Sequence, residues 1–373
     1  MIPRQRMLAA LRREPVDRPP ATPDLYLMFP TKHRGYTQWD VTGPRAHVSV
    51  WKIRLETFRE FGLDAWLQMG VEFAGPKDVH STSRILGEEG QSYEEEITIE
   101  TRKGVLTQRI VHPLHEGEWV SKRLVEDPPA DQKKIACLLD YDPEENYDLS
   151  GYREVVEVLD EDGLVFSNQG SPALNWWLGL CGSARGIYDV ADRQDELRPL
   201  FEHHNELLLR RTEIACREGV EVIEAGGSFT SLSLISPAWY RTFILPVLRV
   251  QAEICHRYGA TLMVQLNGRA NAALEMLREA EVDGTFPLER PPLADVDIGD
   301  AKRRIGDRVC LMGNVDPVNT LLLGTPEEVE REVREIVKAA GPTGLIVSTS
   351  DQTARDTPPE NLEAFRRGVE ETS

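Results

Sequence analysis

The feature that most constrains this chain is the regular alternation of short apolar runs and helical stretches through its second half. Long amphipathic segments, such as residues 195–219 and 326–341, separate the apolar runs from one another. The runs themselves are LVFSNQG, VEVIEAGG, TLMVQLNG, VDGTFPLE, VCLMGNVD and LIVSTSD. Short apolar strands joined by helical crossovers indicate a parallel sheet with helices packed on it.

The same alternation favours a closed barrel over an open, doubly wound sheet. An open sheet that binds a dinucleotide usually carries a GxGxxG turn, and neither GGSFTS at 226–231 nor NGRAN at 267–271 matches that pattern. Two further apolar runs, at 21–29 and 63–70, bring the expected total to about eight strands. We therefore predict an α/β fold, a (β/α)8 TIM barrel spanning 1–373 as a single domain, with its site at the C-terminal ends of the strands.

Two additions to the barrel are expected. Residues 3–13 place apolar side chains at helical spacing before a proline-rich stretch, which predicts an N-terminal helix. Residues 94–112 alternate polar and apolar side chains around Lys103-Gly104, which indicates a hairpin. We place an inserted β-meander at about 72–126.

Composition excludes several classes of function. The chain has 43 Lys and Arg against 62 Asp and Glu, a net charge of -19 that opposes binding to nucleic acid or to an anionic membrane. No run approaches the ~20 apolar residues that cross a bilayer, and the N-terminus lacks the apolar core of a signal peptide. The five cysteines show no CxxC spacing and are expected to be reduced and buried. We expect a cytoplasmic protein.

Several segments carry a family resemblance. They are RQRMLAALRREPVDRPP near the N-terminus, LISPAWYRTFILPVLR in the centre, GNVDPVNTLLLGTPEEV, and TPPENLEAFRRGVEE near the C-terminus. In this order they resemble the uroporphyrinogen decarboxylase superfamily, which holds the decarboxylase and zinc-dependent methyltransferases that act with corrinoid proteins and thiol coenzymes. The resemblance implies the barrel fold and a homodimer.

The chain departs from the decarboxylase pattern. The decarboxylases carry an arginine-rich N-terminal motif for the substrate carboxylates and an aspartate after the following strand for the pyrrole NH groups. The corresponding region here reads LYLMFPTKHRGYTQW, and the next strand ends in Trp66-Leu67-Gln68-Met69 without an aspartate. Decarboxylation of a porphyrinogen is therefore not the first expectation.

The chain also departs from the methyltransferase pattern. There, a His-x-Cys-Gly motif and a later cysteine bind a zinc ion that activates a thiol. This sequence has Gln265-Leu266-Asn267-Gly268 and Ser348-Thr349-Ser350-Asp351 at those places. Amides are poor zinc ligands, so we predict no bound zinc and an atypical member of the superfamily.

Three residues are candidates for proton transfer. Glu224 closes a predicted strand among apolar residues, where burial raises the pKa of a carboxyl group. His33 follows the first predicted strand, and a histidine titrates near neutrality. Asp351 stands at the place of the third zinc ligand. A structural carboxylate at Glu224, a surface histidine at His33, and a Mg2+ site formed by Glu224, Asp316 and Asp351 remain alternatives.

Other polar and aromatic residues at the strand ends are candidates for substrate binding. Gln265 and Asn267 alternate with Leu266, so their side chains should point to the same side and form a donor and acceptor pair. The remaining candidates are Arg34, Gln169, Trp176, Asn314 and Asp316.

The resemblance and the candidate residues leave three expected functions open. The first is a methyltransferase or demethylase acting on a small methylated substrate without thiol-activating zinc, with a corrinoid protein as candidate partner and carrier. The second is a metal-free decarboxylase or lyase acting on a carboxylated, porphyrin-like or aromatic substrate. The third is a non-catalytic barrel that binds a ligand. No motif indicates a tightly bound cofactor.

Overall fold

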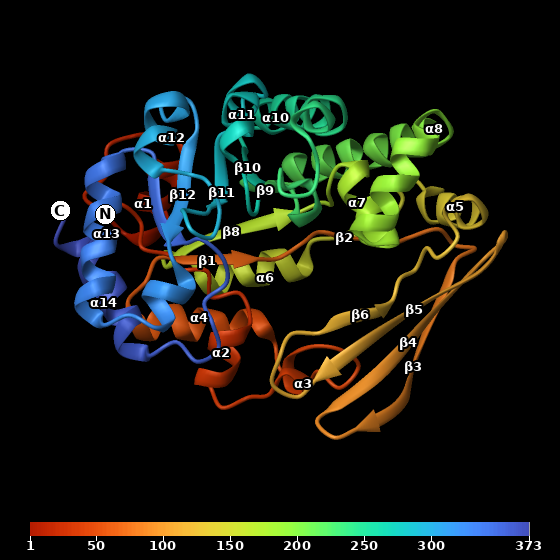
Figure 1. Cartoon of the computed structure of the whole chain (residues 1–373), viewed down its shortest axis with the longest axis horizontal. Coiled ribbons are helices and arrows are strands. Elements are labelled where there is room, and N and C mark those ends of the chain that lie inside the picture. Colours follow the sequence, from red (N-terminus) through yellow and green to blue (C-terminus); the bar gives the residue numbers. More distant parts are fainter. Residues whose placement is uncertain (373) are drawn as a thin grey trace.

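The parallel sheet expected from the alternation is present and curls into a barrel (Figure 1). A computed structural model describes residues 1–372. Seven strands pair in the order β1-β8-β9-β10-β11-β12-β13, and every pairing between them is parallel. They are β1 (Ala65–Gln68), β8 (Gly163–Asn168), β9 (Val222–Gly226), β10 (Thr261–Gln265), β11 (Gly284–Leu288), β12 (Cys310–Val315) and β13 (Leu345–Thr349).

A short extended segment at residues 20–22 closes the barrel between β13 and β1. Ala21 forms a parallel bridge with Val347, and the Asp64 amide, just before β1, donates to the Ala21 carbonyl at 2.9 Å. The strand predicted at 21–29 is therefore wrong beyond its first residues. Pro23 lacks the amide hydrogen that would continue the ladder, and the chain instead enters α2 (Met28–His33).

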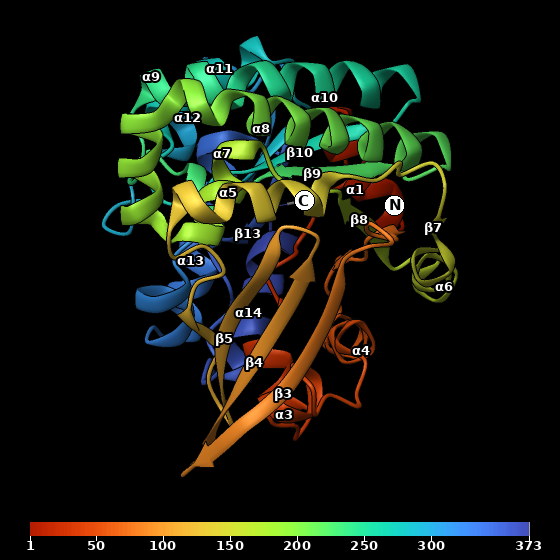
Figure 2. The same cartoon turned by 90° about the vertical axis from the view of Figure 1, so that its right-hand side faces the viewer.

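Helices surround the sheet on its outer side (Figures 1 and 2). The longer ones after α2 are α4 (Val50–Phe61), α5 (Pro128–Ala136), α6 (Ser150–Leu159), α7 (Ala173–Cys181), α8 (Ser183–Arg217), α10 (Leu245–Arg257), α12 (Ile298–Ile305), α13 (Pro326–Ala340) and α14 (Pro359–Glu370). The shorter ones are α3 (Gln38–Val41), η1 (Cys137–Leu139), η2 (Ser228–Thr230), α9 (Pro237–Trp239), η3 (Tyr240–Ile244), η4 (Asn271–Ala273), α11 (Leu274–Glu279) and η5 (Pro317–Leu322).

The predicted N-terminal helix is confirmed as α1 (Pro3–Leu11). Its apolar side chains Met7, Ala10 and Leu11 are fully buried and pack with strand residues that point into the barrel. The helix therefore fills one end of the barrel with apolar side chains. The opposite end, where the strands terminate, is left to form a site.

The inserted meander is also confirmed, and it projects from the barrel (Figures 1 and 2). Four antiparallel strands follow one another: β3 (His80–Glu89), β4 (Ser92–Thr101), β5 (Gly104–Pro113) and β6 (Trp119–Lys122). The predicted start at 72 is too early, because β2 (Glu72–Phe73) pairs instead with the later β7 (Tyr147–Asp148).

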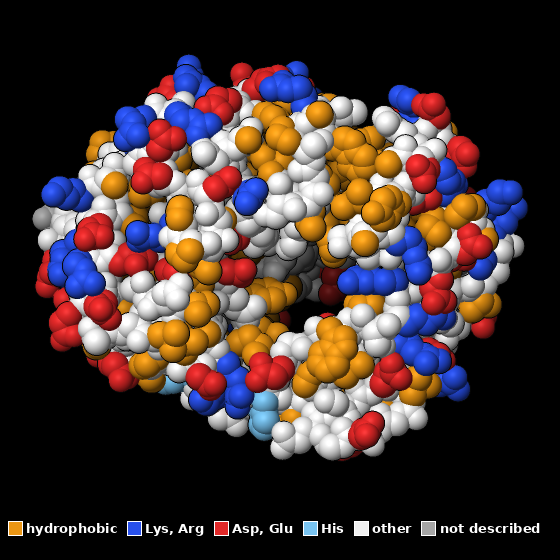
Figure 3. All heavy atoms as spheres, viewed as in Figure 1, with side chains coloured by type: hydrophobic (Ala, Val, Ile, Leu, Met, Phe, Trp, Pro, Cys, Tyr) orange, Lys and Arg blue, Asp and Glu red, His pale blue; other side chains and the backbone are white. Residues whose placement is uncertain are grey.

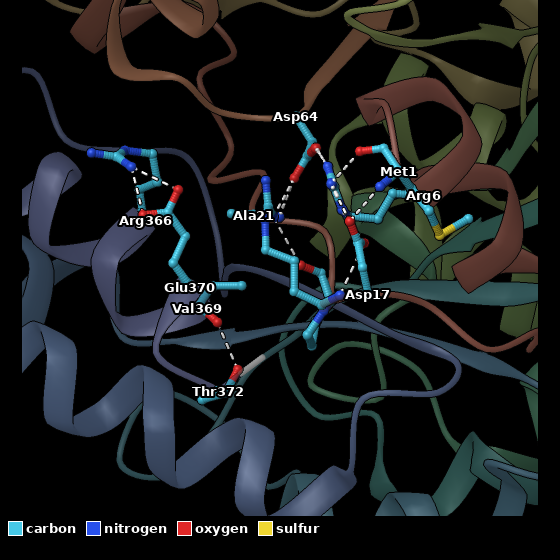
Figure 4. A network of polar contacts seen from close by, with 11 residues as sticks. Met1, Arg6, Asp17, Ala21, Asp64, Arg366, Val369, Glu370 and Thr372 are labelled. Atoms are coloured by element: carbon cyan, nitrogen blue, oxygen red, sulfur yellow. Dashed lines mark hydrogen bonds and ion pairs between the residues drawn. The ribbon is translucent and has the colours of Figure 1, made fainter.

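A polar network ties the N-terminal segment to the start of β1 (Figure 4). The Asp64 side chain is fully buried and accepts from Arg6 Nη1 at 2.6 Å, Arg18 Nη1 at 2.8 Å and the Ala21 amide at 2.8 Å. Arg6 also pairs with Asp17 at 2.8 Å. Both Asp64 oxygens therefore have direct partners, so the network fixes the segment that closes the barrel.

Two expectations from composition can be compared with the described residues. Over residues 1–372, no helix combines the length and the apolar character needed to cross a membrane. All five cysteines are buried and free, as predicted.

Candidate functional site

The open end of the barrel holds a cavity of about 390 Å³. On the face shown in Figure 3, the surface is hollowed between the barrel and the meander. Every barrel strand contributes to the cavity lining, most of them near the C-terminal end, as does the segment after Ala21. The lining residues are Asp24, Tyr26, Arg54, Trp66, Gln68, Phe166, Asn168, Glu224, Ser228, Gln265, Asn267, Phe286, Pro287, Met312, Ser348, Thr349, Asp351 and Gln352.

Glu224 is the most deeply placed carboxyl group of this cavity. It lies on β9 with 5% of its surface exposed. Asn168 on β8 donates to it, and Gln68 Nε2 on β1 lies 3.4 Å from its Oε2. The Gly170 amide donates to Asn168 Oδ1 at 2.7 Å, which leaves the Asn168 NH2 group as the donor to Glu224. Burial raises the pKa of Glu224 to about 7, against the smaller lowering effect of Asn168.

A second carboxyl group, Asp24, lies near Glu224. Its backbone amide donates to Thr349 Oγ1 on β13 at 2.9 Å, which holds the segment after Ala21 against the sheet. Protein atoms surround Asp24, although part of its surface faces the cavity. Burial raises its pKa to about 6; the charge of Arg54 opposes this rise and the charge of Asp351 adds to it.

Arg54 enters the cavity wall from helix α4 rather than from a strand. The side chain is 4% exposed, and its Nη2 donates to the Trp66 carbonyl at 3.0 Å. Its Nε is enclosed without a hydrogen-bond partner. Burial lowers the pKa of Arg54, with Asp24 as the strongest opposing charge.

Aromatic rings form the cavity floor. Trp66 stacks on Phe166 with ring centroids 4.6 Å apart, and Phe286 meets both rings edge-on at 6.5 and 6.4 Å. These rings are in the same apolar cluster as the α1 side chains that fill the barrel. The floor is therefore rigid and excludes water from beneath the carboxyl groups.

The structure brings four predicted residues together at this cavity: Glu224, Gln265, Asn267 and Asp351. Gln265 and Asn267 both line it, as their spacing predicts. Asn267 Oδ1 accepts from Ser228 Oγ at 3.4 Å, while Asp351 is exposed at the rim and accepts from the Gln352 amide at 2.6 Å. Two amides and two carboxyl groups predicted from the sequence therefore line the same cavity.

His33 and Arg34 lie elsewhere, which corrects their predicted placement. His33 Nε2 pairs with Glu60 at 2.9 Å and its ring stacks on Phe29, while Arg34 pairs with the same Glu60 at 2.8 Å. The reason is the short first strand. Because the chain enters α2 early, these residues lie at the end of that helix and pack beside α4 instead of following a strand into the cavity.

Four further candidates contact other parts of the protein instead of the cavity. Gln169 is buried and donates to Ser167 Oγ at 2.7 Å, and Asn314 donates to the Leu288 carbonyl at 2.9 Å. Asp316 caps η5 through the Val318 and Asn319 amides, and Trp176 stacks on His204 at 4.3 Å. Gln169 points away from the cavity because side chains alternate along a strand and its neighbour Asn168 points inward. The four residues hold the frame of the barrel and do not line the cavity.

The metal alternatives find little support in the donor chemistry. The side chains at the family's zinc positions are two amides, Gln265 and Asn267, and one carboxylate, Asp351, which does not fit a zinc site. In the described part of the chain, no three His, Cys, Asp or Glu side chains gather as metal ligands. Asp316 is engaged as a helix cap, so the trio with Glu224 and Asp351 does not form.

Sequence reasoning missed several polar residues of the cavity, among them Asp24, Tyr26, Arg54, Gln68 and Asn168. Asn168 could have been chosen over its neighbour Gln169, because Phe166 and Asn168 stand two apart and face the same side. Arg54 also carried a signal. It shares a helix face with apolar residues three before and four after it, where an arginine is uncommon unless it has a role.

A second pocket, the outer pocket, adjoins the cavity. Its volume is about 430 Å³ and its own lining is largely apolar, with Leu27, Val50, Trp51 and Met69. The two spaces share the walls formed by Tyr26, Arg54, Gln68 and Asn168. Arg54 therefore stands at the junction, while Glu224 and the aromatic floor belong to the inner cavity alone.

Comparisons with known proteins identify relatives. A family model described as Uroporphyrinogen decarboxylase (URO-D) matches residues 125–372. The uroporphyrinogen decarboxylase of Trichodesmium erythraeum is 28% identical over 268 residues, which cover 68% of this chain and 72% of that protein. That of Chlorobaculum tepidum is 25% identical over 258 residues, covering 66% and 71%.

Among solved structures, a methyltransferase from Methanosarcina mazei superposes with a TM-score of 0.66. It covers 100% of this chain and 99% of its own, at 16% sequence identity. At that identity, the likeness shows a shared fold and no more.

Proposed function

This chain belongs to the uroporphyrinogen decarboxylase family, and from that premise we propose that it removes a methyl group from a small methylated substrate. The substrate binds in the inner cavity, and Glu224 supplies a proton. The methyl group passes to a nucleophilic acceptor that enters from the open end of the barrel. A reduced corrinoid, free or on a carrier protein, is the acceptor class we propose.

The observation that carries this proposal is the state of Glu224. Its carboxyl group is buried at the wall of the cavity, where its pKa rises to about 7. A group with that pKa holds a proton for part of the time near neutrality and can release it without a large penalty. A methyl group bound to oxygen or nitrogen leaves more readily when that heteroatom is protonated.

The step balances without an oxidant. The bond between the methyl carbon and the heteroatom breaks, and its electron pair stays on the heteroatom. The acceptor supplies the electron pair of the new bond to the methyl carbon. The heteroatom takes the proton of Glu224, and water at the cavity mouth returns a proton to the carboxylate.

The charge of the cavity favours a small substrate over a tetrapyrrole with many carboxylates. Asp24, Glu224 and Asp351 are acidic, whereas Arg54 is the single basic residue of the cavity lining within residues 1–372. A polycarboxylate would place several negative charges beside these groups with one guanidinium to offset them.

The experiment is an anaerobic incubation of the purified protein with chemically reduced cobalamin and a panel of methyl ethers and methylamines. Loss of the methyl group is followed by proton NMR of the substrate. We expect Glu224→Gln to lower the rate about 10²–10⁴-fold. Glu60→Gln, a change outside the cavity, serves as the matched control. A panel without any demethylated product, or an unchanged rate in Glu224→Gln, would contradict the proposal.

Decarboxylation of a small acid is the second candidate, and Arg54 is the observation that favours it. A guanidinium beside the proton donor could hold a carboxylate while the proton of Glu224 goes to the carbon that loses CO2. The relatives named as decarboxylases lie at 25–28% identity. Release of CO2 without any acceptor would favour this function, and binding without turnover would favour a ligand-binding barrel.

A further inference from the structure

Arg54 carries a buried positive charge that its protein surroundings leave incompletely paired. One of its terminal nitrogens, Nη2, donates to the Trp66 carbonyl, and Nε is enclosed without a partner. The other terminal nitrogen, Nη1, has no hydrogen-bond partner in the chain as described. A guanidinium has five N–H donors, so most of its capacity is unused.

The carboxyl group with the strongest charge effect on Arg54 forms no ion pair with it. Asp24 is the strongest acidic influence on Arg54, yet the two form no ion pair among residues 1–372. The neighbouring aromatic ring of Tyr26 lies 5.5 Å from the guanidinium carbon and is a weak partner. A buried charge with so few partners costs free energy unless a ligand supplies the missing opposite charge and hydrogen-bond acceptors.

The place of Arg54 defines where that ligand group would sit. Arg54 lines both the inner cavity and the outer pocket, whereas Glu224 and the aromatic floor line the inner cavity alone. A ligand bound at the guanidinium therefore extends inward past Gln68 and Asn168 toward Glu224.

We propose that the substrate carries one carboxylate, which Arg54 binds at the junction of the two pockets, and that this contact directs the methyl-bearing end toward Glu224. A planar carboxylate matches the geometry of a guanidinium and forms charge-assisted hydrogen bonds with it. A neutral methyl ether would leave the charge of Arg54 unpaired. A polycarboxylate would carry more negative charges than the single basic group, Arg54, can pair. This inference names the substrate class and rests on the proposed function.

The test measures binding without turnover, so that it is independent of the reaction. Two pairs of probes differ only in charge: methoxyacetate with 2-methoxyacetamide, and 4-methoxybenzoate with 4-methoxybenzamide. Calorimetric titration without acceptor gives each affinity. We expect the wild type to bind at least one carboxylate about 30-fold more tightly than its amide, the effect of a paired buried charge.

Variants separate a binding role for Arg54 from a structural one. Arg54→Gln should reduce carboxylate affinity about 30-fold and leave amide affinity within about threefold. Arg54→Lys keeps the charge and should retain part of the preference, which also covers the case that Arg54→Gln fails to fold. Arg34→Gln, whose arginine pairs with Glu60 outside the cavity, should change neither affinity.

The outcomes also separate this inference from the proposed function. Equal affinity for carboxylate and amide in the wild type, no binding of any carboxylate, or an equal loss of both in Arg54→Gln would overturn the inference. Demethylation of an uncharged compound together with equal affinities would overturn the inference while the proposed function stands. A bound carboxylate that is never demethylated would leave the inference and contradict the function.

Discussion

Buried charges at the two ends of the barrel are arranged differently. At the closed end, Asp64 is fully buried and contacts Arg6, Arg18 and the Ala21 amide at 2.6–2.8 Å. At the open end, Glu224 is almost as buried, yet its hydrogen-bond partners are amides, and burial shifts its pKa to about 7. The first arrangement stabilises the fold, whereas the second keeps a group in a state that a reaction can use.

The largest expected effect on stability is at the closed end. Asp64→Asn removes the buried carboxylate that Arg6 and Arg18 share, and Arg6 is itself buried, so we expect the free energy of unfolding to fall by about 3–5 kcal/mol. Chemical denaturation measures it. The surface control Glu60→Gln should change stability by at most about 1 kcal/mol. Equal effects of the two variants would contradict the contrast between the ends.

At the open end, we expect a substitution to change the free energy of unfolding in the opposite direction. A carboxyl group whose pKa rises on folding, here from 4.5 to about 7, destabilises the protein as pH increases through that interval. Removing the charge with Glu224→Gln should therefore raise the free energy of unfolding by about 1–3 kcal/mol at about pH 8. Near pH 4, where Glu224 is mostly protonated in both states, the gain should nearly vanish. A loss of stability at both pH values would show that Glu224 is a structural carboxylate.

The smallest effect is expected for a residue that lies at neither end of the barrel. His33→Ala removes a ring that packs on Phe29 and pairs with Glu60, away from the cavity. We expect kcat/KM to stay within about twofold of the wild type, because surface changes of this kind cost little. A large fall in kcat/KM with unchanged stability would restore His33 as a proton-transfer residue.

Most of the fold could be predicted from the sequence because the barrel strands are short apolar runs whose ends are clearly marked by polar residues and glycines. The six strands of the second half and the N-terminal helix appear where their patterns indicate, and so does the meander except for its start, which is at His80 and not at 72. The first strand could not be delimited, because residues 21–29 are apolar enough for a strand. Only the structure shows that the backbone pairing of this segment with β13 is limited to residues 20–22.

The candidate site was predictable in part for a related reason. Residues at strand ends, such as Glu224 and Gln265, were found because a barrel brings all strand ends to one opening. Which of two adjacent polar residues faces inward depends on the exact strand phase, so Asn168 was missed. Arg54 reaches the cavity from a helix, and its direction depends on how that helix packs against the barrel.

The proposed function depends most directly on the proton that Glu224 holds near neutrality. An infrared titration can observe it through the C=O band of the protonated carboxyl group, assigned by subtracting spectra of Glu224→Gln from those of the wild type. The account predicts a difference band that disappears with a midpoint near pH 7. A midpoint near 4.5, the ordinary value of a glutamate, would contradict it.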